Sequence, residues 1–265
     1  MIKTKSGIYQ SLLLESPNIV HGFSSKRFGD MRNRVKRKTF FSELGIEETS
    51  VVWEEQIHKD HIHVVVENDR GTTISDVDGL VYKQSPDDIS IVLSVHTGDC
   101  VPLLAVDQVG KIIGVAHAGW KGTTLHIGKK LISEMEKLGA QAQHIRVVIG
   151  PRIGMCCYTI TANRADVFRE EFMQSRKAGF SFPELKKSQF REWCVNSDVI
   201  KERNGNFFAD IGKANYIDLL SVGIKPEHID YDRTLCTCCR TNDFYSFRKG
   251  KGVLKGEMLG VIGSR

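Results

Sequence analysis

Short apolar runs separated by polar turns recur along this chain, and two of them dominate its middle. Residues Val101–Val106 and Ile112–Ala116 are unbroken apolar stretches whose length is typical of buried strands. Similar runs predict further strands at Leu12–Val20 (interrupted by Pro17), Val51–His58, Ile62–Glu67, Ile89–Val95, Ile145–Ile149, His228–Tyr231 and Met258–Ile262, and Asp76–Tyr82 indicates a turn that enters a strand.

The period of the apolar pattern changes after Gly122. Apolar or small residues recur at helical spacing from Leu125 to Leu138, with Thr123 or Thr124 positioned to cap the helix and Gly139 to end it. Comparable patterns predict helices at Thr39–Leu44, Thr161–Phe172, Pro183–Phe190 and Asp210–Leu220. Some strands follow one another directly while others alternate with helices, so the sequence predicts a layered α/β or α+β domain with a mixed sheet.

Composition changes this picture only slightly. The chain has 265 residues, 41% of them hydrophobic, which is enough for a substantial core in one domain. The 37 basic and 32 acidic residues leave a net charge of +5, an excess too small to indicate nucleic-acid binding. No apolar run approaches the roughly 18 residues of a membrane span, and the N-terminus lacks the apolar core of a signal peptide. We therefore expect a cytoplasmic protein without membrane or nucleic-acid partners.

The cysteines fit a reducing compartment better than a disulfide framework, because their number is odd and several are adjacent. They are Cys100, Cys156, Cys157, Cys194, Cys236, Cys238 and Cys239. We expect Cys156 and Cys157 to pack as small apolar residues. The cysteines of residues 236–239 lack a second half of cysteines or histidines nearby, so their spacing gives little support for a second zinc site.

Each of the two central runs abuts a turn that carries reactive side chains. The turn Thr97–Cys100 supplies a carboxylate and a thiol, and the turn His117–Gly122 supplies an imidazole and a cation. Glycines in both turns let backbone and ligand approach closely. His117 and Lys121 also lie where a predicted strand becomes a helix, and the free N–H groups of a first helical turn favour an anion.

These turns suggest a metal site. Zinc accepts thiolate and imidazole ligands together, as Cys100 and His117 would supply, and a catalytic zinc takes three protein ligands. His58, also at a strand end, is the natural third ligand. Two alternatives use the same residues: a buried cysteine beside a capping histidine, and a metal-free Cys–His nucleophile pair. Asp99 either serves as a general base or ligand-orienting group, or makes a local turn.

Positive residues elsewhere are candidates for binding an anion. Arg248 follows Phe244–Phe247, whose alternation predicts a strand with Ser246 and Arg248 on one face. The guanidinium suits bidentate phosphate binding, or it simply lies at the surface. The basic run of residues 32–38 indicates a solvated loop or an anion-binding rim. The glycine-rich motifs of the common nucleotide-binding folds are absent.

Four blocks, TGDCVPLLAVD, VAHAGWKGT, IGPRIGMCCYTI and FYSFRKG, together resemble the signature of the laccase-domain family of YfiH-like and YlmD-like proteins. EQIHKDHI and HGFSSKRFGD are similar to two further blocks, so the resemblance extends from His21 to Ile262. It implies a single-domain, three-layer α/β/α sandwich with a mixed sheet. It also implies a zinc ion bound by His58, Cys100 and His117.

The resemblance implies an activity as well. Members of this family are described as phosphorolysing adenosine, inosine, guanosine and methylthioadenosine and as deaminating adenosine, and some as copper polyphenol oxidases. We therefore expect a zinc-dependent purine nucleoside phosphorylase with adenosine deaminase activity, with copper as the alternative metal. The expected catalytic residues are Cys100, His117 and Asp99, and the cations expected to hold phosphate or substrate are Lys26, Arg27, Lys121 and Arg248.

The chain departs from the family pattern in and after its most N-terminal block, HGFSSKRFGD. Lys26 stands where an arginine is usual, and Phe28–Met31 replaces a Gly-Gly-Val-Ser segment. Lys121 also replaces an arginine, which removes a bidentate phosphate contact. The alternatives to nucleoside chemistry are a cysteine hydrolase acting on a cell-wall precursor, a copper-dependent polyphenol oxidase, and a metal-binding or redox-sensing interaction protein that uses the cysteine-rich tail.

Overall fold

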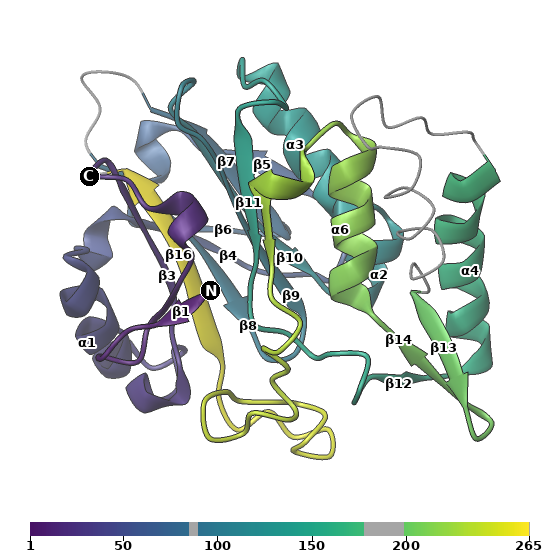
Figure 1. The fold of residues 1–265 in the computed structure, drawn as a ribbon. Helices are drawn as coiled ribbons and strands as arrows, with labels where there is room; N and C mark the ends of the chain where they lie inside the picture. Colours follow the sequence, from purple (N-terminus) through teal and green to yellow (C-terminus); the bar gives the residue numbers. More distant parts are fainter. Residues whose placement is uncertain (85–89, 178–198, 265) are drawn as a thin grey trace.

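The computed structural model describes residues 1–84, 90–177 and 199–264, and two large mixed sheets form its centre (Figure 1). The first sheet has the order β1 (Ile2–Lys3), β2 (Tyr9–Gln10), β3 (Ile19–Phe23), β16 (Met258–Ser264), β8 (Val92–Thr97), β4 (Val51–Glu54) and β6 (Thr73–Ile74). The second has the order β15 (Ile229–Tyr231), β11 (Ile145–Ile149), β9 (Val101–Asp107), β10 (Ile112–Ala118), β7 (Gly79–Lys83) and β5 (Ile62–Val64). A small third sheet has the order β12 (Thr159–Ile160), β14 (Asn206–Ala209) and β13 (Ile200–Arg203).

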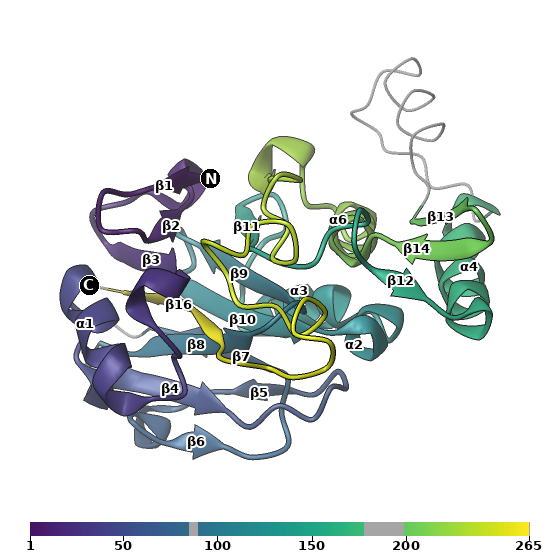
Figure 2. The ribbon, with the colours of Figure 1, turned by 90° about the horizontal axis from the view of Figure 1, so that it is seen from below.

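Helices cover the outer face of each large sheet. The α-helices are α1 (Arg34–Leu44), α2 (Trp120–Thr124), α3 (Ile127–Lys137), α4 (Ala162–Lys177) and α6 (Ile211–Ser221). Short 3₁₀ helices span Leu12–Leu14, Lys26–Phe28, Glu48–Ser50, Glu67–Asp69 and Pro226–His228. Helix α1 packs its aromatic face on the first sheet, whereas α3 and α6 pack on the second. In both ribbon views α1 and α4 lie at opposite sides of the molecule (Figures 1 and 2).

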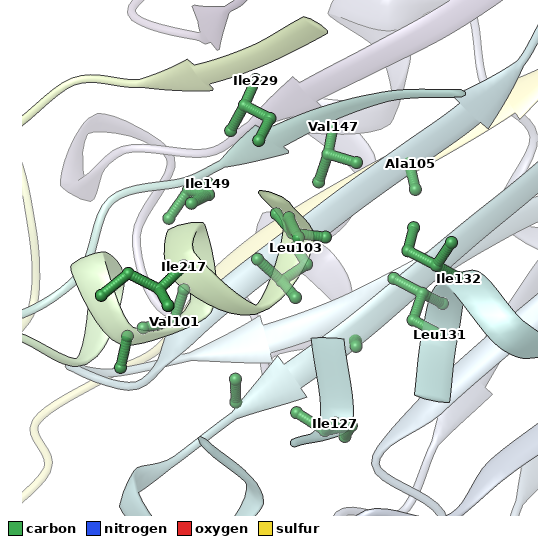
Figure 3. Packing of buried hydrophobic residues seen from close by; sticks show 14 of the residues in the cluster. Val101, Leu103, Ala105, Ile127, Leu131, Ile132, Val147, Ile149, Ile217 and Ile229 are labelled. Carbon is green, nitrogen blue, oxygen red and sulfur yellow. The ribbon is translucent and has the colours of Figure 1, made fainter. Parts of the chain in front are cut away.

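Alternation along β9 shows how the layers are joined. Leu103 and Ala105 point toward α3 and α6 and belong to the same apolar core as residues of those helices (Figure 3). Leu104 and Val106 point the other way and meet Leu93 of the first sheet in a second core. Because successive strand residues face opposite sides, a continuous apolar run such as β9 requires partners on both. The two sheets therefore pack face to face, with helices outside.

The predicted α/β class with mixed sheets is confirmed, and the β layer between the helices consists of two sheets. The strands predicted at Val101–Val106, Ile112–Ala116 and Ile145–Ile149 are present with nearly the same ends. In the described ranges, no helix is both long and apolar enough to cross a lipid bilayer.

The strand predicted at Leu12–Val20 is wrong. The Ser11 side chain accepts a hydrogen bond from the Leu13 N–H and starts a 3₁₀ helix, so β3 begins only at Ile19. The strands predicted at Val51–His58 and Ile62–Glu67 end early, at Glu54 and Val64 respectively.

Two helix boundaries also differ from the prediction. The basic run expected to be a loop forms the first turns of α1, because the Asn33 side chain accepts from the N–H groups of Val35 and Lys36 and caps a helix there. The predicted cap residues Thr123 and Thr124 belong to the short helix α2, so they do not cap α3. His126, at φ 59°, takes the N-cap position of α3 instead. The helix predicted at Pro183–Phe190 lies outside the described residues.

The strand predicted from Phe244 to Arg248 is also wrong, because backbone N–H groups of this region donate to turns instead of to a neighbouring strand. The Phe247 N–H donates to the Gly98 carbonyl, and the Gly250 N–H donates to the Ser246 carbonyl. The segment 235–257, which precedes β16, therefore contains no strand. The N–H groups of Phe247 and Arg248 bond to Gly98 and Asp99 in the turn before β9 instead of extending a sheet.

Candidate metal centre

Three neighbouring strands of the second sheet bring the predicted site together. In the antiparallel pairing of β9 and β10, Ala118 lies opposite Val101, so the end of β10 adjoins the start of β9, which Cys100 directly precedes. On the other side of β10, Ala116 pairs with Gly79, and the His117 N–H donates to the carbonyl of Asp78. Strand register thus aligns Asp78, His117 and Cys100 at one edge of the sheet.

His58, Cys100 and His117 form a compact group at this edge. One ligating atom from each lies within 4.8 Å of the others. The two imidazole rings meet edge to face, with centroids 4.7 Å apart and an interplanar angle of 83°. Gly119 borders the group, because a Cβ there would lie 3.3 Å from Cys100 Sγ and 3.3 Å from His58 Cδ2. The three residues predicted to bind metal are therefore brought together.

Asp78 orients two members of this group and was not recognised from the sequence. Its carboxylate accepts hydrogen bonds from the N–H groups of His58 (2.9 Å) and Lys59 (2.6 Å). The same carboxylate lies 3.0 Å from Nδ1 of His117, and both side chains are buried. A carboxylate on one imidazole nitrogen fixes the tautomer and leaves the other nitrogen to bind a metal. Only its place in a turn was predictable.

The charges of the group favour a thiolate. Burial alone would raise the pKa of the Cys100 thiol, but His117 and His58 outweigh that effect and lower it to about 6. Burial would lower the pKa of His117, but the neighbouring Cys100 and Asp78 raise it to about 10. A thiolate is both the metal-binding and the nucleophilic form of cysteine, so the arrangement serves either chemistry.

Two residues at the site have backbone angles that side chains rarely adopt. His58 has a φ of 55° and Asp99 a φ of 113°. Such conformations cost roughly 1–3 kcal/mol each and persist where surrounding contacts enforce them. For His58 the contact is its N–H bond to Asp78. For Asp99 it is a set of hydrogen bonds to the C-terminal segment.

Asp99 is buried, and its carboxylate has defined partners. It accepts from Thr237 Oγ1 at 2.5 Å and from the Arg248 N–H at 2.7 Å. Burial raises the pKa of Asp99, although these hydrogen bonds act in the opposite direction. Asp99 thus joins the turn before β9 to the segment 235–257 through partners that are distant in the sequence, and its predicted role as a general base stays a prediction.

The four predicted anion-binding cations are not gathered at one point. Arg248 donates to the carbonyls of Thr159 (2.9 Å) and Cys157 (3.4 Å), and Arg27 donates to the carbonyl of Lys5 at 2.8 Å. Lys26 and Lys121 contact, respectively, the Thr241 carbonyl at 2.9 Å and the face of Trp120 at 5.8 Å. Of these four, Lys121 makes no contact with a backbone carbonyl in the described structure.

Other polar and aromatic residues near the site were missed. Arg164 stacks on Trp120 at 4.4 Å from the ring centroid, and it also interacts with Tyr158. Burial, and to a lesser extent the charge of Cys100, raise the pKa of Tyr158 to about 12. A cation–aromatic cluster of Trp120, Tyr158 and Arg164 therefore adjoins the Cys100 thiol. Nothing in the local pattern around Arg164, in a polar helix, distinguished it from a surface arginine.

Glu54, at the end of β4, is another missed residue. It is only 6% exposed, and burial raises its pKa to about 8. Gln56 donates to one carboxylate oxygen, while the other has no hydrogen-bond partner among the residues that the structure describes. Its charge interacts with His117. A buried carboxyl group with a raised pKa is suited to carrying a proton.

The donor set fits a zinc ion with an open coordination position. It comprises one thiolate and two imidazoles, a combination found in catalytic zinc sites. His117 and Cys100 are held by rigid strand ends, and His58 is exposed on the outer side. Two histidines and one cysteine also suit copper, which binds such ligands more tightly than zinc does. Chemistry of the ligands alone therefore allows both metals.

The chain is similar to several known proteins. A family model described as "Multi-copper polyphenol oxidoreductase laccase" matches residues 16–265. Purine nucleoside phosphorylase YlmD of Geobacillus stearothermophilus is 32% identical over 223 residues, 80% of this chain and 71% of the relative. A protein named adenosine deaminase RL5, from an unknown prokaryotic organism, is 28% identical over 221 residues, 80% of this chain and 75% of the relative. The crystal structure of YlmD from G. stearothermophilus is similar with a TM-score of 0.75 at 28% identity, covering 94% of this chain and 93% of that one.

Proposed function

Because the chain belongs to the family described as multi-copper polyphenol oxidoreductase laccases, which it shares with relatives named for nucleoside enzymes, we propose that it is a zinc-dependent purine nucleoside phosphorylase that also deaminates adenosine. The observation that carries the proposal is the His58–Cys100–His117 group with Asp78 behind it. The substrates would be a purine nucleoside and phosphate.

In this proposal His58, Cys100 and His117 hold the metal. Zinc, when bound, supplies Lewis acidity at the reacting centre. Asp78 keeps His117 in the tautomer that presents Nε2, and Gly119 leaves room for the three ligands.

Positive charge for phosphate is available beside the metal group. Lys121 and Arg164 both lie over the ring of Trp120, so they supply two cations beside one aromatic side chain. A guanidinium suits bidentate phosphate binding, and an aromatic face suits a purine or a ribose edge. Lys26, Arg27 and Arg248 remain predicted phosphate contacts; the Arg248 side chain would first have to leave the Thr159 and Cys157 carbonyls.

Two carboxyl groups are candidates for carrying protons. Asp99 was predicted for this role, which remains a prediction. Its carboxylate oxygens already accept hydrogen bonds from Thr237 and Arg248. Glu54 is the second candidate, since burial holds its pKa near neutral values and one of its oxygens lacks a partner in the described structure.

A nucleoside panel tests the proposal. Zinc-loaded protein is incubated with adenosine, inosine, guanosine or methylthioadenosine, with and without phosphate, and products are separated by chromatography. We expect free base only with phosphate, and inosine from adenosine without it. Cys100→Ala should abolish both activities, whereas His61→Ala, which alters an exposed histidine outside the metal group, should retain them. Zinc-loaded protein that forms neither product contradicts the proposal.

One observation favours a second function, a metal-free cysteine hydrolase acting on an amide such as a cell-wall precursor. Cys100, His117 and Asp78 stand in the order of a nucleophile, a base and an orienting carboxylate. This function predicts full amidase activity in chelator and covalent capture of Cys100 by a thiol-directed substrate analogue. Loss of that activity in chelator would exclude it.

Copper chemistry is distinguished by the metal that the protein retains. Elemental analysis of protein purified without added metal should give zinc in the proposed case. Copper at the same stoichiometry, together with oxidation of a polyphenol, would instead support the polyphenol oxidase alternative. In both cases His117→Ala should remove this metal, because it removes a ligand.

A further inference from the structure

A second group of possible metal ligands lies outside the centre described above. Four cysteine thiols from two distant segments converge, and their Sγ atoms all lie within 4.8 Å of one another. They are Cys156, Cys157, Cys236 and Cys239. The sequence suggested that the first two would merely pack as small apolar residues, and that the other two lacked partners. The fold places the two cysteine pairs side by side, so each pair supplies the missing ligands of the other.

The separations suit a shared metal. In a tetrahedral site with zinc–sulfur distances of about 2.3 Å, neighbouring sulfurs are about 3.8 Å apart. Here Cys239 Sγ lies 3.5 Å from Cys156 Sγ and 3.3 Å from Cys157 Sγ. Both distances far exceed the roughly 2.05 Å of a disulfide. Since all the separations lie within 4.8 Å, the four sulfurs are close enough to share one ion.

The backbone holds the two segments in register. Arg152 and Cys236 form a parallel bridge, supported by hydrogen bonds from the Thr237 N–H to the Arg152 carbonyl and from the Arg152 N–H to the Leu235 carbonyl. The Arg240 N–H donates to the Cys236 carbonyl and closes the turn that carries the C-x-x-C pair. The thiols therefore sit on a framework that other contacts already determine.

Cys236 also has the local environment of a metal-binding thiolate. Its Sγ accepts a hydrogen bond from the Gly154 N–H at 3.2 Å. Cys236 is 4% exposed, while Cys156 and Cys239 reach the surface, so the group has both a buried anchor and an entry path.

We propose that Cys156, Cys157, Cys236 and Cys239 bind a structural zinc ion, separate from the metal of the His58–Cys100–His117 centre. A complete set of four thiolates leaves no position for substrate, so this site is structural. The His58–Cys100–His117 group differs in this respect, because its three ligands leave one coordination position open for a substrate.

The proposed ion would stiffen the wall of the first site. Thr237, inside the C-x-x-C turn, donates to Asp99, and the Cys157 carbonyl accepts from Arg248. Both contacts lead from the thiol group to residues around Cys100. We therefore expect loss of the second ion to loosen segments 152–159 and 235–250 without removing the ligands of the first centre.

Metal stoichiometry tests this proposal. Protein purified under reducing conditions with zinc present should hold two zinc ions per chain. The double variant Cys236→Ser, Cys239→Ser should hold one. The matched control is Cys238→Ser, because Cys238 lies in the same turn but outside the thiol group, and it should still hold two. Two ions in the double variant, or the loss of one in Cys238→Ser, would overturn the assignment of ligands.

Cobalt substitution identifies the ligands even if the double variant does not fold. In His117→Ala, which disables the first centre, one cobalt ion should remain, with the intense sulfur-to-metal charge-transfer absorption of a tetrahedral tetrathiolate. A chain in which neither wild type nor His117→Ala gives this absorption has no second site. Persistence of the absorption in His117→Ala stands whatever the nucleoside panel shows, so the two proposals fail separately.

A thiol count distinguishes the remaining alternative. Denatured protein is titrated with a thiol reagent in chelator, with and without prior reduction. Equal counts, together with two zinc ions, support the proposal. A count that is lower by two before reduction, with only one zinc ion present, would show that this group forms a disulfide and would overturn the metal site.

Discussion

Replacing Asp78 by asparagine tests the proposed metal centre most directly, because the change keeps the size of the side chain and removes its charge. The carboxylate accepts from the N–H groups of His58 and Lys59 and contacts Nδ1 of His117. An amide has only one acceptor oxygen, so its NH₂ group must face one of these donors. We expect Asp78→Asn to disturb both the orientation of His117 and the backbone of His58.

The size of the effect follows from these contacts. Removing a group that orients a metal-binding histidine typically weakens metal binding by about 10–100-fold, which corresponds to about 1.4–2.7 kcal/mol. Burial would raise the pKa of Asp78, but hydrogen bonds from His117 and from the Lys59 N–H lower it, so the native side chain is ionised. Asp78→Asn should therefore also lower the free energy of unfolding of the metal-free protein, by roughly 1–3 kcal/mol.

The assay is a competition for zinc between the protein and a chromophoric chelator of known affinity. Asp76→Asn is the matched control, because it makes the same chemical change two residues away at an exposed position. Asp76 has a φ of 59°, a conformation that asparagine tolerates. Circular dichroism confirms that each variant is folded before its affinity is compared.

Two results would refute the reasoning. The first is that Asp78→Asn binds zinc with less than about a tenfold loss, below the range for a group that orients a ligand. Alternatively, Asp76→Asn could weaken zinc binding as strongly, which would make the effect one of net charge. In the first case His117 does not depend on Asp78 for its orientation, and in the second the hydrogen bonds are not responsible.

Three further predictions concern stability and packing. Burial lowers the pKa of His21 from 6.5 to about 4, so between these pH values the unfolded chain binds more protons than the folded protein. The free energy of unfolding should therefore fall by up to about 3 kcal/mol as the pH drops from 6.5 to 4. Urea titrations at several pH values should show a smaller dependence of this free energy on pH in His21→Asn than in wild type. Leu103→Ala, at a fully buried position, should lower the free energy of unfolding by about 2–5 kcal/mol, measured by the same method. Gly119→Ala should weaken zinc binding with little change in the thermal midpoint, because its Cβ would crowd Cys100 Sγ and His58 Cδ2 at 3.3 Å; unchanged affinity by chelator competition would contradict this.

The grouping of Cys100 with His117 was predictable because its signal is local, whereas metal binding by this group stays a prediction. Cys100 and His117 adjoin apolar runs whose length is typical of buried strands, so each residue was placed at a strand end. Asp78 was not distinguishable from a turn residue, because its role depends on the pairing of β7 with β10. Partners of this kind follow from register, which can be determined only when the packing of both strands in the fold is known.

The thiol group shows the same limit more sharply. Cys156 and Cys157 precede β12, whereas Cys236 and Cys239 follow β15, and no local pattern connects the two pairs. The prediction for the segment after Phe244 failed for a related reason, because alternation indicates a strand only where a neighbouring strand offers hydrogen bonds. In this fold the neighbours of that segment are turns, and it bonds to Gly98 and Asp99 instead.

The geometry of the first centre depends on strand register more than on its loops. Antiparallel pairing places Pro102 opposite His117, and a shift of β10 by one residue would turn His117 to the other face of the sheet. Leu104 and Val115 face each other in the core between the sheets and resist such a shift, since it would bury the wrong side chains. The apolar core and the metal group therefore select the same register. That agreement explains how residues far apart in the sequence can form one site without long structured loops.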